Sequence, residues 1–131
     1  MGRKDGTGSS VNKSTNILLD FKNKEINIGE ELDCIISINY TGRFDSVSIN
    51  SQIEDSSDVF TYTEINGKKI NHPYARLSLM KKELLDPTNI RFKAITKHIP
   101  KSTESVVKLR ATLIQEHKEL ASEVKFIKIK K

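Results

Sequence analysis

Every second residue from Leu32 to Tyr40 is apolar, and Asp33, Ser37 and Asn39 lie between the apolar positions. Successive side chains of a β-strand point to opposite faces, so a period of two gathers the apolar residues on one face. An α-helix would scatter the same residues around its axis, because its period is 3.6. This segment therefore predicts a strand with one buried face and one wet face, and a fold that packs such strands together.

Similar short apolar runs follow along the chain, separated by turn signals at the spacing of about 8–12 residues that is typical of a sandwich or barrel. Asn66-Gly67 is the strongest signal, because both residues tolerate the positive φ of a two-residue hairpin turn. We predict an all-β fold, an antiparallel sandwich of about seven to eight strands. The expected strands cover residues 17–28 with a polar interruption at 22–24, then 32–40, 47–53, 59–65, 77–79, 90–94, 107–113 and 124–129.

The segment 105–124 is also compatible with a helix. Its apolar residues include Val106, Leu109 and Leu113 at helical spacing, and residues 116–121 favour a helix by propensity. Against this, apolar and polar residues alternate strictly from Val107 to Leu113. We therefore favour two strands joined by a turn near His117–Glu119, and we keep the helix as the alternative.

Residues 1–15 are mostly polar and offer little to bury, so we expect a flexible polar tail there and a single domain over residues 16–131. The tail lacks the apolar core of a signal peptide, and no run of about 18 apolar residues is present to span a membrane. Cys34, the one cysteine, lies among apolar residues and is expected to be a buried thiol. These features favour a reducing compartment, and we expect a cytoplasmic location.

Two segments resemble the immunoglobulin-like β-sandwich superfamily, arrestin-like variants included. Residues 26–32 read Ile-Asn-Ile-Gly-Glu-Glu-Leu, which is similar to the entry to the second strand in many such domains. The closing pair, residues 108–118 and 122–130, resembles their final strand pair. The resemblance implies a sandwich fold and, because such domains mostly bind other molecules, a binding role.

No group of residues has the spacing of a catalytic or metal site. His72, His98 and His117 are far apart, whereas zinc ligands come in pairs at short intervals. The acidic segment Glu54–Asp58 offers oxygen atoms to calcium but lacks the glycine and the spacing of an EF-hand loop. We expect a protein that is not an enzyme and that uses no metal or other cofactor.

Charge is distributed unevenly along the chain. Residues 25–66 hold nine acidic residues and one basic residue, a net charge of −8, whereas residues 67–131 hold sixteen basic and six acidic residues, a net charge of +10. Strand parity places most of these bases on outward faces, where they either attract an anionic partner or keep the strand edges soluble. The candidate anion-binding residues are Arg76, Arg91, Lys93, Lys97, Lys108, Arg110, Lys125, Lys128 and Lys130.

The leading hypothesis is a non-catalytic interaction or adaptor module that binds a partner protein through sheet edges or loops. The alternative is a binder of nucleic acid, another anionic polymer or an anionic membrane through the basic residues. Aromatic residues between the bases would favour nucleic acid, because bases stack on them. Phe92 and Phe126 are both predicted to point inward, which favours the protein partner.

Overall fold

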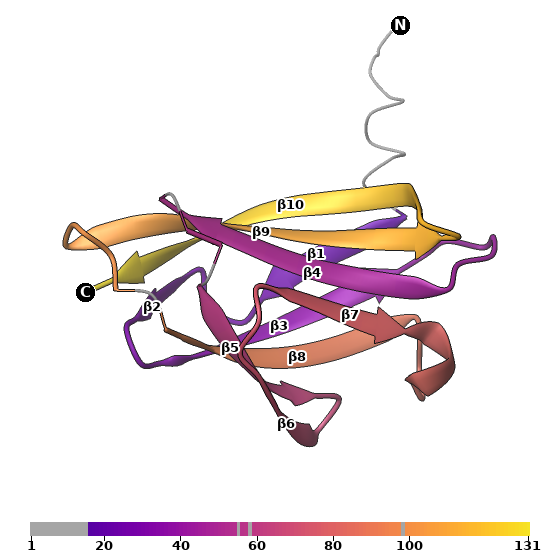
Figure 1. The fold of residues 1–131 in the computed structure, drawn as a ribbon, viewed down its shortest axis with the longest axis horizontal. Helices are drawn as coiled ribbons and strands as arrows, with labels where there is room; N and C mark the ends of the chain where they lie inside the picture. Colours follow the sequence, from indigo (N-terminus) through magenta and orange to yellow (C-terminus); the bar gives the residue numbers. More distant parts are fainter. Residues whose placement is uncertain (1–15, 55, 58, 98) are drawn as a thin grey trace, which may run out of the picture.

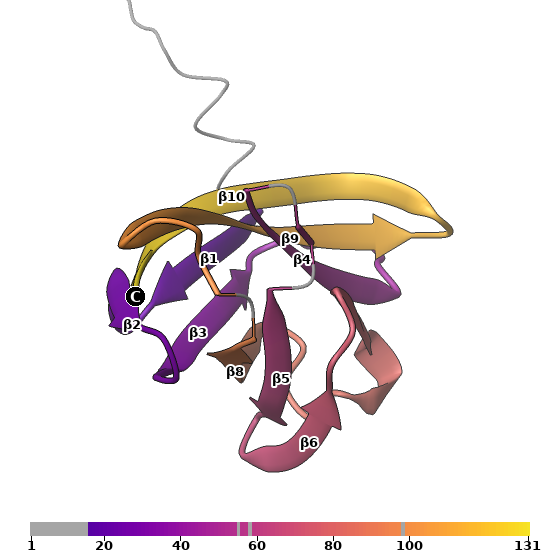
Figure 2. The same ribbon diagram turned by 60° about the vertical axis from the view of Figure 1, so that its left-hand side comes forward.

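The computed structural model describes residues 16–54, 56–57, 59–97 and 99–131, which fold almost entirely into β-strands (Figure 1). The expected tail over residues 1–15 lies outside the described residues. Two sheets of five strands each pack face to face, and Figure 2 shows β10, β9 and β4 as one layer above β1, β3, β8 and β5. The all-β sandwich predicted from the sequence is confirmed.

The first sheet is antiparallel throughout and has the strand order β1-β3-β8-β5-β6. Its residues alternate between buried and outward positions, as the period of two in the sequence requires. Its strands are β1 (Ile17–Phe21), β3 (Glu31–Ile38), β8 (Asn89–Thr96), β5 (Phe60–Ile65) and β6 (Lys68–His72).

The second sheet has the order β2-β10-β9-β4-β7, and its β2–β10 pair is parallel, unlike the wholly antiparallel sandwich that we predicted. A single 3₁₀ turn, η1 (Lys81–Glu83), follows β7, and no helix among the described residues is long and apolar enough to cross a membrane. The strands of this sheet are β2 (Glu25–Asn27), β10 (Lys118–Lys130), β9 (Glu104–Gln115), β4 (Ser46–Ile53) and β7 (Arg76–Met80).

The predicted first strand over residues 17–28 is wrong, because the chain changes sheet in its middle. β1 pairs with β3 in the first sheet, and β2 pairs with β10 in the second. The polar residues 22–24 make this crossing, and Lys22, directly after β1, donates its N–H to the Asp33 carbonyl of β3 at 2.9 Å. This split, together with β6, raises the number of strands to ten over the described residues.

Two hairpin turns have the backbone conformation that such turns require. Asn66 and Gly67 join β5 to β6 with φ values of 49° and 83°, which confirms the hairpin prediction. Glu116 and His117 join β9 to β10 with φ values of 50° and 67°, so the turn begins one residue before the expected position. The segment 105–124 lies in these two strands and their turn, and the helical alternative is wrong.

The strand order agrees with a constant-type immunoglobulin sandwich, whose sheets run A-B-E-D and C-F-G. The first sheet contains β1-β3-β8-β5, which corresponds to A-B-E-D. The second contains β4-β9-β10, which corresponds to C-F-G. There are two differences: β2 adds a parallel strand beside β10, and an insertion between β5 and β8 supplies β6, which extends the first sheet, and β7, which extends the second. β7 therefore forms an added edge beside β4.

Aliphatic residues from both sheets fill the interior, with an aromatic group at the β5–β8 side. The ring of Tyr62 lies 6.5 Å from that of Phe60 and 5.9 Å from that of Phe92, centroid to centroid. The Tyr62 hydroxyl and the nearby Ser51 hydroxyl are buried, and neither makes a hydrogen bond of ordinary geometry to the described residues. Burial raises the pKa of Tyr62 to about 12, and Ser51 opposes this rise only in part.

Candidate binding face

The two-layer fold separates the nine candidate anion-binding residues. Arg91 and Lys93 lie on the outer face of the first sheet, whereas Lys108 and Arg110 lie on the outer face of the second. The sequence gives the parity of a side chain within its strand, but parity alone does not say which sheet the strand joins. The candidate residues therefore form no single basic surface.

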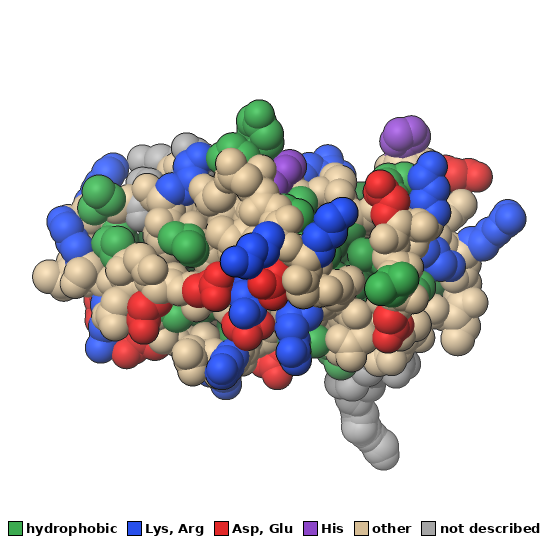
Figure 3. Space-filling model, turned by 90° about the horizontal axis from the view of Figure 1, so that it is seen from below, with side chains coloured by type: hydrophobic (Ala, Val, Ile, Leu, Met, Phe, Trp, Pro, Cys, Tyr) green, Lys and Arg blue, Asp and Glu red, His purple; other side chains and the backbone are tan. Residues whose placement is uncertain are grey.

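Acidic residues surround Lys93 on the outer face of the first sheet. Its Nζ lies 3.7 Å from carboxylate oxygens of both Glu31 and Glu64, and Asp33 is its direct cross-strand neighbour. Figure 3, which views this side of the molecule, shows basic and acidic side chains interspersed at its centre. The positive charge of Lys93 is thus largely balanced by the neighbouring carboxylates.

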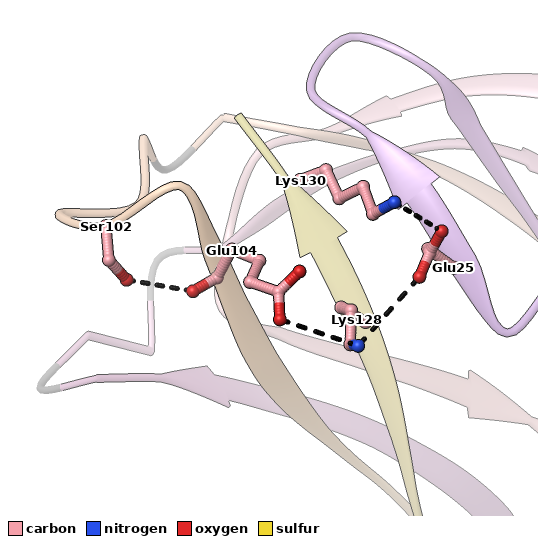
Figure 4. Close-up of polar contacts among 5 residues, drawn as sticks. All are labelled: Glu25, Ser102, Glu104, Lys128 and Lys130. Carbon is pink, nitrogen blue, oxygen red and sulfur yellow. Dashed lines mark hydrogen bonds and ion pairs between the residues drawn. The ribbon is translucent and has the colours of Figure 1, made fainter.

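Lys128 and Lys130 are engaged in ion pairs that fasten β2 and β9 to β10 (Figure 4). Lys130 Nζ lies 2.9 Å from a Glu25 oxygen, and Lys128 Nζ lies 3.5 Å from Glu104 and 4.0 Å from Glu25. The hydrogen bond from Lys130 is the main cause that lowers the pKa of Glu25, and Glu25 in turn raises the pKa of Lys130. These two lysines therefore support the parallel β2–β10 pair.

Two further candidates lie apart from the others. Lys97 Nζ donates a hydrogen bond to the Pro73 carbonyl at 2.8 Å. Lys125 was expected on the outer face with Lys108 and Arg110, and this is wrong: it pairs with Leu109, and direct partners in an antiparallel ladder project to the same side. Lys125 is exposed and lies where β10 is an edge strand, since β2 pairs only with residues 128–130 of β10.

A polar groove crosses the outer face of the second sheet, and it brings together Arg76, Lys108 and Arg110. Arg76 and Arg110 are both register partners of Asn50, and Lys108 is the partner of Gln52 in the next row. Arg76 and Lys108 have no acidic partner among the residues that the structure describes. The groove has a volume of about 450 Å³ and is lined by Ser48, Asn50, Ser51, Gln52, Ser57, Arg76, Lys108, Arg110, Thr112, Ile114, His117 and Glu119.

Small hydroxyl residues form the floor of this groove. Ser48 and Thr112 are direct partners on β4 and β9, and they are only 2% and 5% exposed although they lie on the outer face. Their side chains are short, so the face is hollow between the row of arginines and the β9–β10 turn, where His117 and Glu119 line the rim. We term this groove, with its arginine row and hydroxyl floor, the basic groove.

Arg110 is held in place within the basic groove. Its Nη2 donates to Glu119 Oε1 at 2.8 Å and to Ser122 Oγ at 3.4 Å. Its Nε has no hydrogen-bond partner in the described part of the chain. A guanidinium carries five N–H donors; the contacts through Nη2 orient the group and Nε is buried, so Nη1 supplies the donors for a ligand.

Phe126 was predicted to point inward, and this is wrong. Its side chain is 60% exposed and lies directly opposite Lys108 on the outer face, while Val124 lies opposite Arg110. The sequence contains two adjacent apolar residues, Phe126 and Ile127, and either could have started the inward phase of the strand. The register with β9 selects Ile127, so Phe126 borders the basic groove on its β10 side.

The other chemical candidates do not assemble into a site. No three His, Cys, Asp or Glu side chains lie close enough to hold a metal ion within the described ranges, and His98, Asp55 and Asp58 lie outside them. The ring of His72 donates from Nε2 to the Arg76 carbonyl at 2.8 Å. Cys34 is buried, and burial raises the pKa of its thiol, which disfavours the thiolate that a nucleophile would need.

No family model matches the chain, and no curated protein sequence matches it. Among solved structures, the human F-spondin reeler domain is similar with a TM-score of 0.58 at 15% identity, over 86% of this chain and 91% of that domain. The CFA/I adhesin CfaE of enterotoxigenic E. coli gives 0.56 at 13% identity over 88% of this chain, which spans about half (48%) of the adhesin. AvmM, which catalyses macrocyclization in alchivemycin A biosynthesis, gives 0.51 at 8% identity, over 89% of this chain and 90% of AvmM. At these identities the likeness shows the all-β sandwich fold alone.

Proposed function

We propose that this chain is a non-catalytic binding module that holds an acidic segment of a partner protein in the basic groove. The observation that carries the proposal is the placement of Arg76 and Arg110 on either side of Asn50 in one row. Arginine presents a planar fork of donors that matches a carboxylate, so two of them in one groove favour an acidic ligand. Three of the other candidate bases, Lys93, Lys128 and Lys130, are instead engaged by acidic neighbours.

The lining of the groove favours a protein segment over a uniform polyanion. Glu119 places a negative charge at the rim, and Asn50 and Gln52 offer both donors and acceptors. A polyanion would meet repulsion at Glu119, whereas a protein segment can place a polar or basic side chain there. The mixed chemistry of the groove therefore fits a ligand of mixed chemistry.

The adhesin CfaE has the same fold and supports a binding role, and the strand order is consistent with membership of the immunoglobulin-like superfamily. AvmM has this fold too and is an enzyme, so the fold alone does not distinguish binding from catalysis. The burial of Cys34 and the separation of the histidines favour binding. The cytoplasmic location inferred from the sequence is part of the same proposal.

The test is the affinity for poly-L-glutamate at low salt, measured by titration calorimetry; this polymer supplies the carboxylates for the arginine row but not the polar or basic side chain beside Glu119, so it probes the arginine row alone. We expect Arg76→Gln combined with Arg110→Gln to weaken binding at least tenfold. The matched control, Arg91→Gln combined with Lys93→Gln, removes the same charge from the opposite sheet and should change affinity less than threefold. Equal losses in both double variants would show that net charge, and not the groove, binds the ligand.

A second candidate function is the binding of single-stranded nucleic acid, and the exposure of Phe126 opposite Lys108 favours it. A base stacked on this ring would have its phosphates near Lys108 and Arg110. Binding of a fluorescent oligothymidylate tests it: nucleic acid requires that Phe126→Ala weaken binding at least fivefold and that affinity fall steeply with salt. Tighter binding of poly-L-glutamate than of the oligonucleotide would support the protein partner.

A further inference from the structure

The edge strand β7 has main-chain groups that no other strand engages. The Arg76 carbonyl bonds to the His72 ring, away from β4, whereas the Lys81 N–H bonds to the Asp45 carbonyl on the β4 side. Main-chain groups of alternate residues in a strand point to opposite sides. Ser78 therefore directs its N–H and C=O groups outward and Met80 its N–H, and in the described residues these groups have no partner, whereas the Met80 C=O begins the 3₁₀ turn η1.

The edges β6 and β2 and the uncovered part of β10 carry features that keep strands from pairing, and the edge β1 carries Asp20, whereas β7 carries no charge after its first residue, Arg76. The edge strand β6 begins with Lys68 and Lys69, and β2 has only three residues. The uncovered part of β10 carries Lys125, a charge on the inward side of the ladder. Short length and inward or edge charges are common protections against pairing. β7 has no charged residue between Arg76 and Lys81.

The two ends of the β7 edge differ in chemistry. At one end the Arg76 side chain lines the basic groove. At the other end Met80 is 38% exposed and, with Phe44, Leu84 and Pro87, forms the apolar part of a hollow of about 500 Å³ that Asp45, Lys81 and Lys82 also line. Arg76 and Met80 lie on the same face, four residues apart, which is about 13 Å along a strand.

We infer that β7 is a docking edge, to which an extended segment of the partner protein adds as a further strand. This inference rests on the proposed function and names the form of the partner. The segment pairs its main chain with Ser78 and Met80, places an acidic side chain beside Arg76, and places an apolar side chain, four residues away on the same face, at the Met80 hollow. A second copy of this chain fits less well, because antiparallel pairing centred on Ser78 would place Arg76 beside Met80 of the copy and not beside an acid.

The experiment selects linear peptides of about twelve residues from a phage-displayed random library on the full chain, with salt held low. Enriched peptides are resynthesised and their affinities measured for the natural chain, for Ser78→Pro and for the matched control Ser78→Thr. Proline at residue 78 removes an N–H that points outward and leaves the β4 ladder intact, so the fold is expected to survive. Met80→Lys is a second variant that places a charge at the edge without changing the backbone.

We expect enriched peptides to carry an acidic and an apolar residue four positions apart. Their binding should weaken at least tenfold in Ser78→Pro and in Met80→Lys and less than twofold in Ser78→Thr. Hydrogen exchange at the Ser78 and Met80 amides should slow at least tenfold when the peptide binds. Peptides that bind Ser78→Pro as tightly and leave these amides unprotected would overturn the docking edge.

The outcomes separate this inference from the proposed function. If binding survives Ser78→Pro but is lost in the Arg76→Gln and Arg110→Gln variant, the groove binds the ligand and the edge does not. If no peptide is enriched, or the chain forms a dimer that Ser78→Pro dissociates, the docking edge for a partner is wrong, and the poly-L-glutamate titration still decides whether the groove binds acids. If binding is lost only in Ser78→Pro and Met80→Lys, the edge is the site and the groove is not.

Discussion

Arg76 of β7 and Arg110 of β9 are register partners of the same residue, Asn50 of β4, and all three project from the outer face of the second sheet. Neighbouring strands lie about 4.8 Å apart, so the two arginine backbones are about 10 Å from each other across β4. Among the described residues, Arg110 has an acidic partner, Glu119, and Arg76 has none. The row is thus a pair of cationic groups at fixed spacing with a polar residue between them.

Glu119 limits the positive charge of the basic groove, because its Oε1 accepts a hydrogen bond from Arg110 Nη2 at 2.8 Å. We expect Glu119→Gln to raise the affinity for poly-L-glutamate about 1.4- to fivefold, the range that an exposed ion pair of about 0.2–1 kcal/mol allows. Glu123→Gln removes the same charge from the same strand without touching Arg110 and serves as the control. An unchanged or lower affinity in Glu119→Gln would contradict the role of Arg110.

The buried Tyr62 hydroxyl has no hydrogen bond of ordinary geometry to the described residues, so removing it should cost nothing. We expect Tyr62→Phe to leave the free energy of unfolding in urea unchanged or to raise it by about 1 kcal/mol. Tyr74→Phe removes an exposed hydroxyl and is the control. A loss of more than about 1 kcal/mol in Tyr62→Phe would show that the hydroxyl is satisfied in solution.

The same residue predicts a dependence on alkaline pH. The pKa of Tyr62 is raised to about 12 in the folded chain, from 10 for the ordinary group, so the unfolded chain releases this proton first. The contribution of the protonated Tyr62 to the free energy of unfolding is complete below about pH 10 and is lost between about pH 10 and 12. The free energy of unfolding is measured against pH for the natural chain and for Tyr62→Phe, and the difference separates this loss from that caused by the lysines. The same pH dependence in both chains would rule out the effect of Tyr62.

The ion pair between Glu25 and Lys130 predicts a dependence on acid pH. Because the pKa of Glu25 is lowered in the folded chain, its contribution to stability is present above the ordinary pKa of a glutamate and disappears as the pH falls through the lowered value. We expect NMR titration of the Glu25 side chain to give a midpoint below the ordinary value of 4.5. Lys130→Gln should move the midpoint upward more than Lys128→Gln does, because Lys130 makes the stronger contact. The reverse order would contradict the arrangement in Figure 4.

Cys34 should react slowly while the chain is folded. It is fully buried on β3, and burial raises the pKa of its thiol, so the reactive thiolate is scarce and inaccessible. We expect labelling with Ellman's reagent at pH 8 to take at least a hundred times longer in buffer than in concentrated urea. Comparable rates in the two conditions would mean that β3 opens readily.

The strands themselves could be predicted where one face is buried and the other is wet. Leu32, Cys34, Ile36 and Ile38 are all buried on β3, as their period of two requires. The turn at Asn66-Gly67 was predictable because few residues tolerate its backbone conformation. These are local properties, and local sequence decides them.

The binding face could be predicted only in part, because it depends on contacts between distant segments. Arg91 and Arg110 have similar surroundings in sequence, but β8 and β9 join different sheets. The register of β10 with β9 places Phe126 on the outer face and Lys125 on the inner face, the reverse of the prediction. The sequence leaves this choice open, because Phe126 and Ile127 are adjacent and both apolar. The ion pairs of Lys93 and Lys128 likewise join residues far apart in the chain.

The most direct test of the binding face is a map of amide chemical-shift changes in the ¹⁵N-labelled chain as poly-L-glutamate is added. We expect the largest changes at Asn50, Arg76, Lys108 and Arg110, with small changes at Arg91 and Lys93 on the opposite sheet. Changes centred on Arg91 and Lys93, or spread evenly over both sheets, would contradict the account.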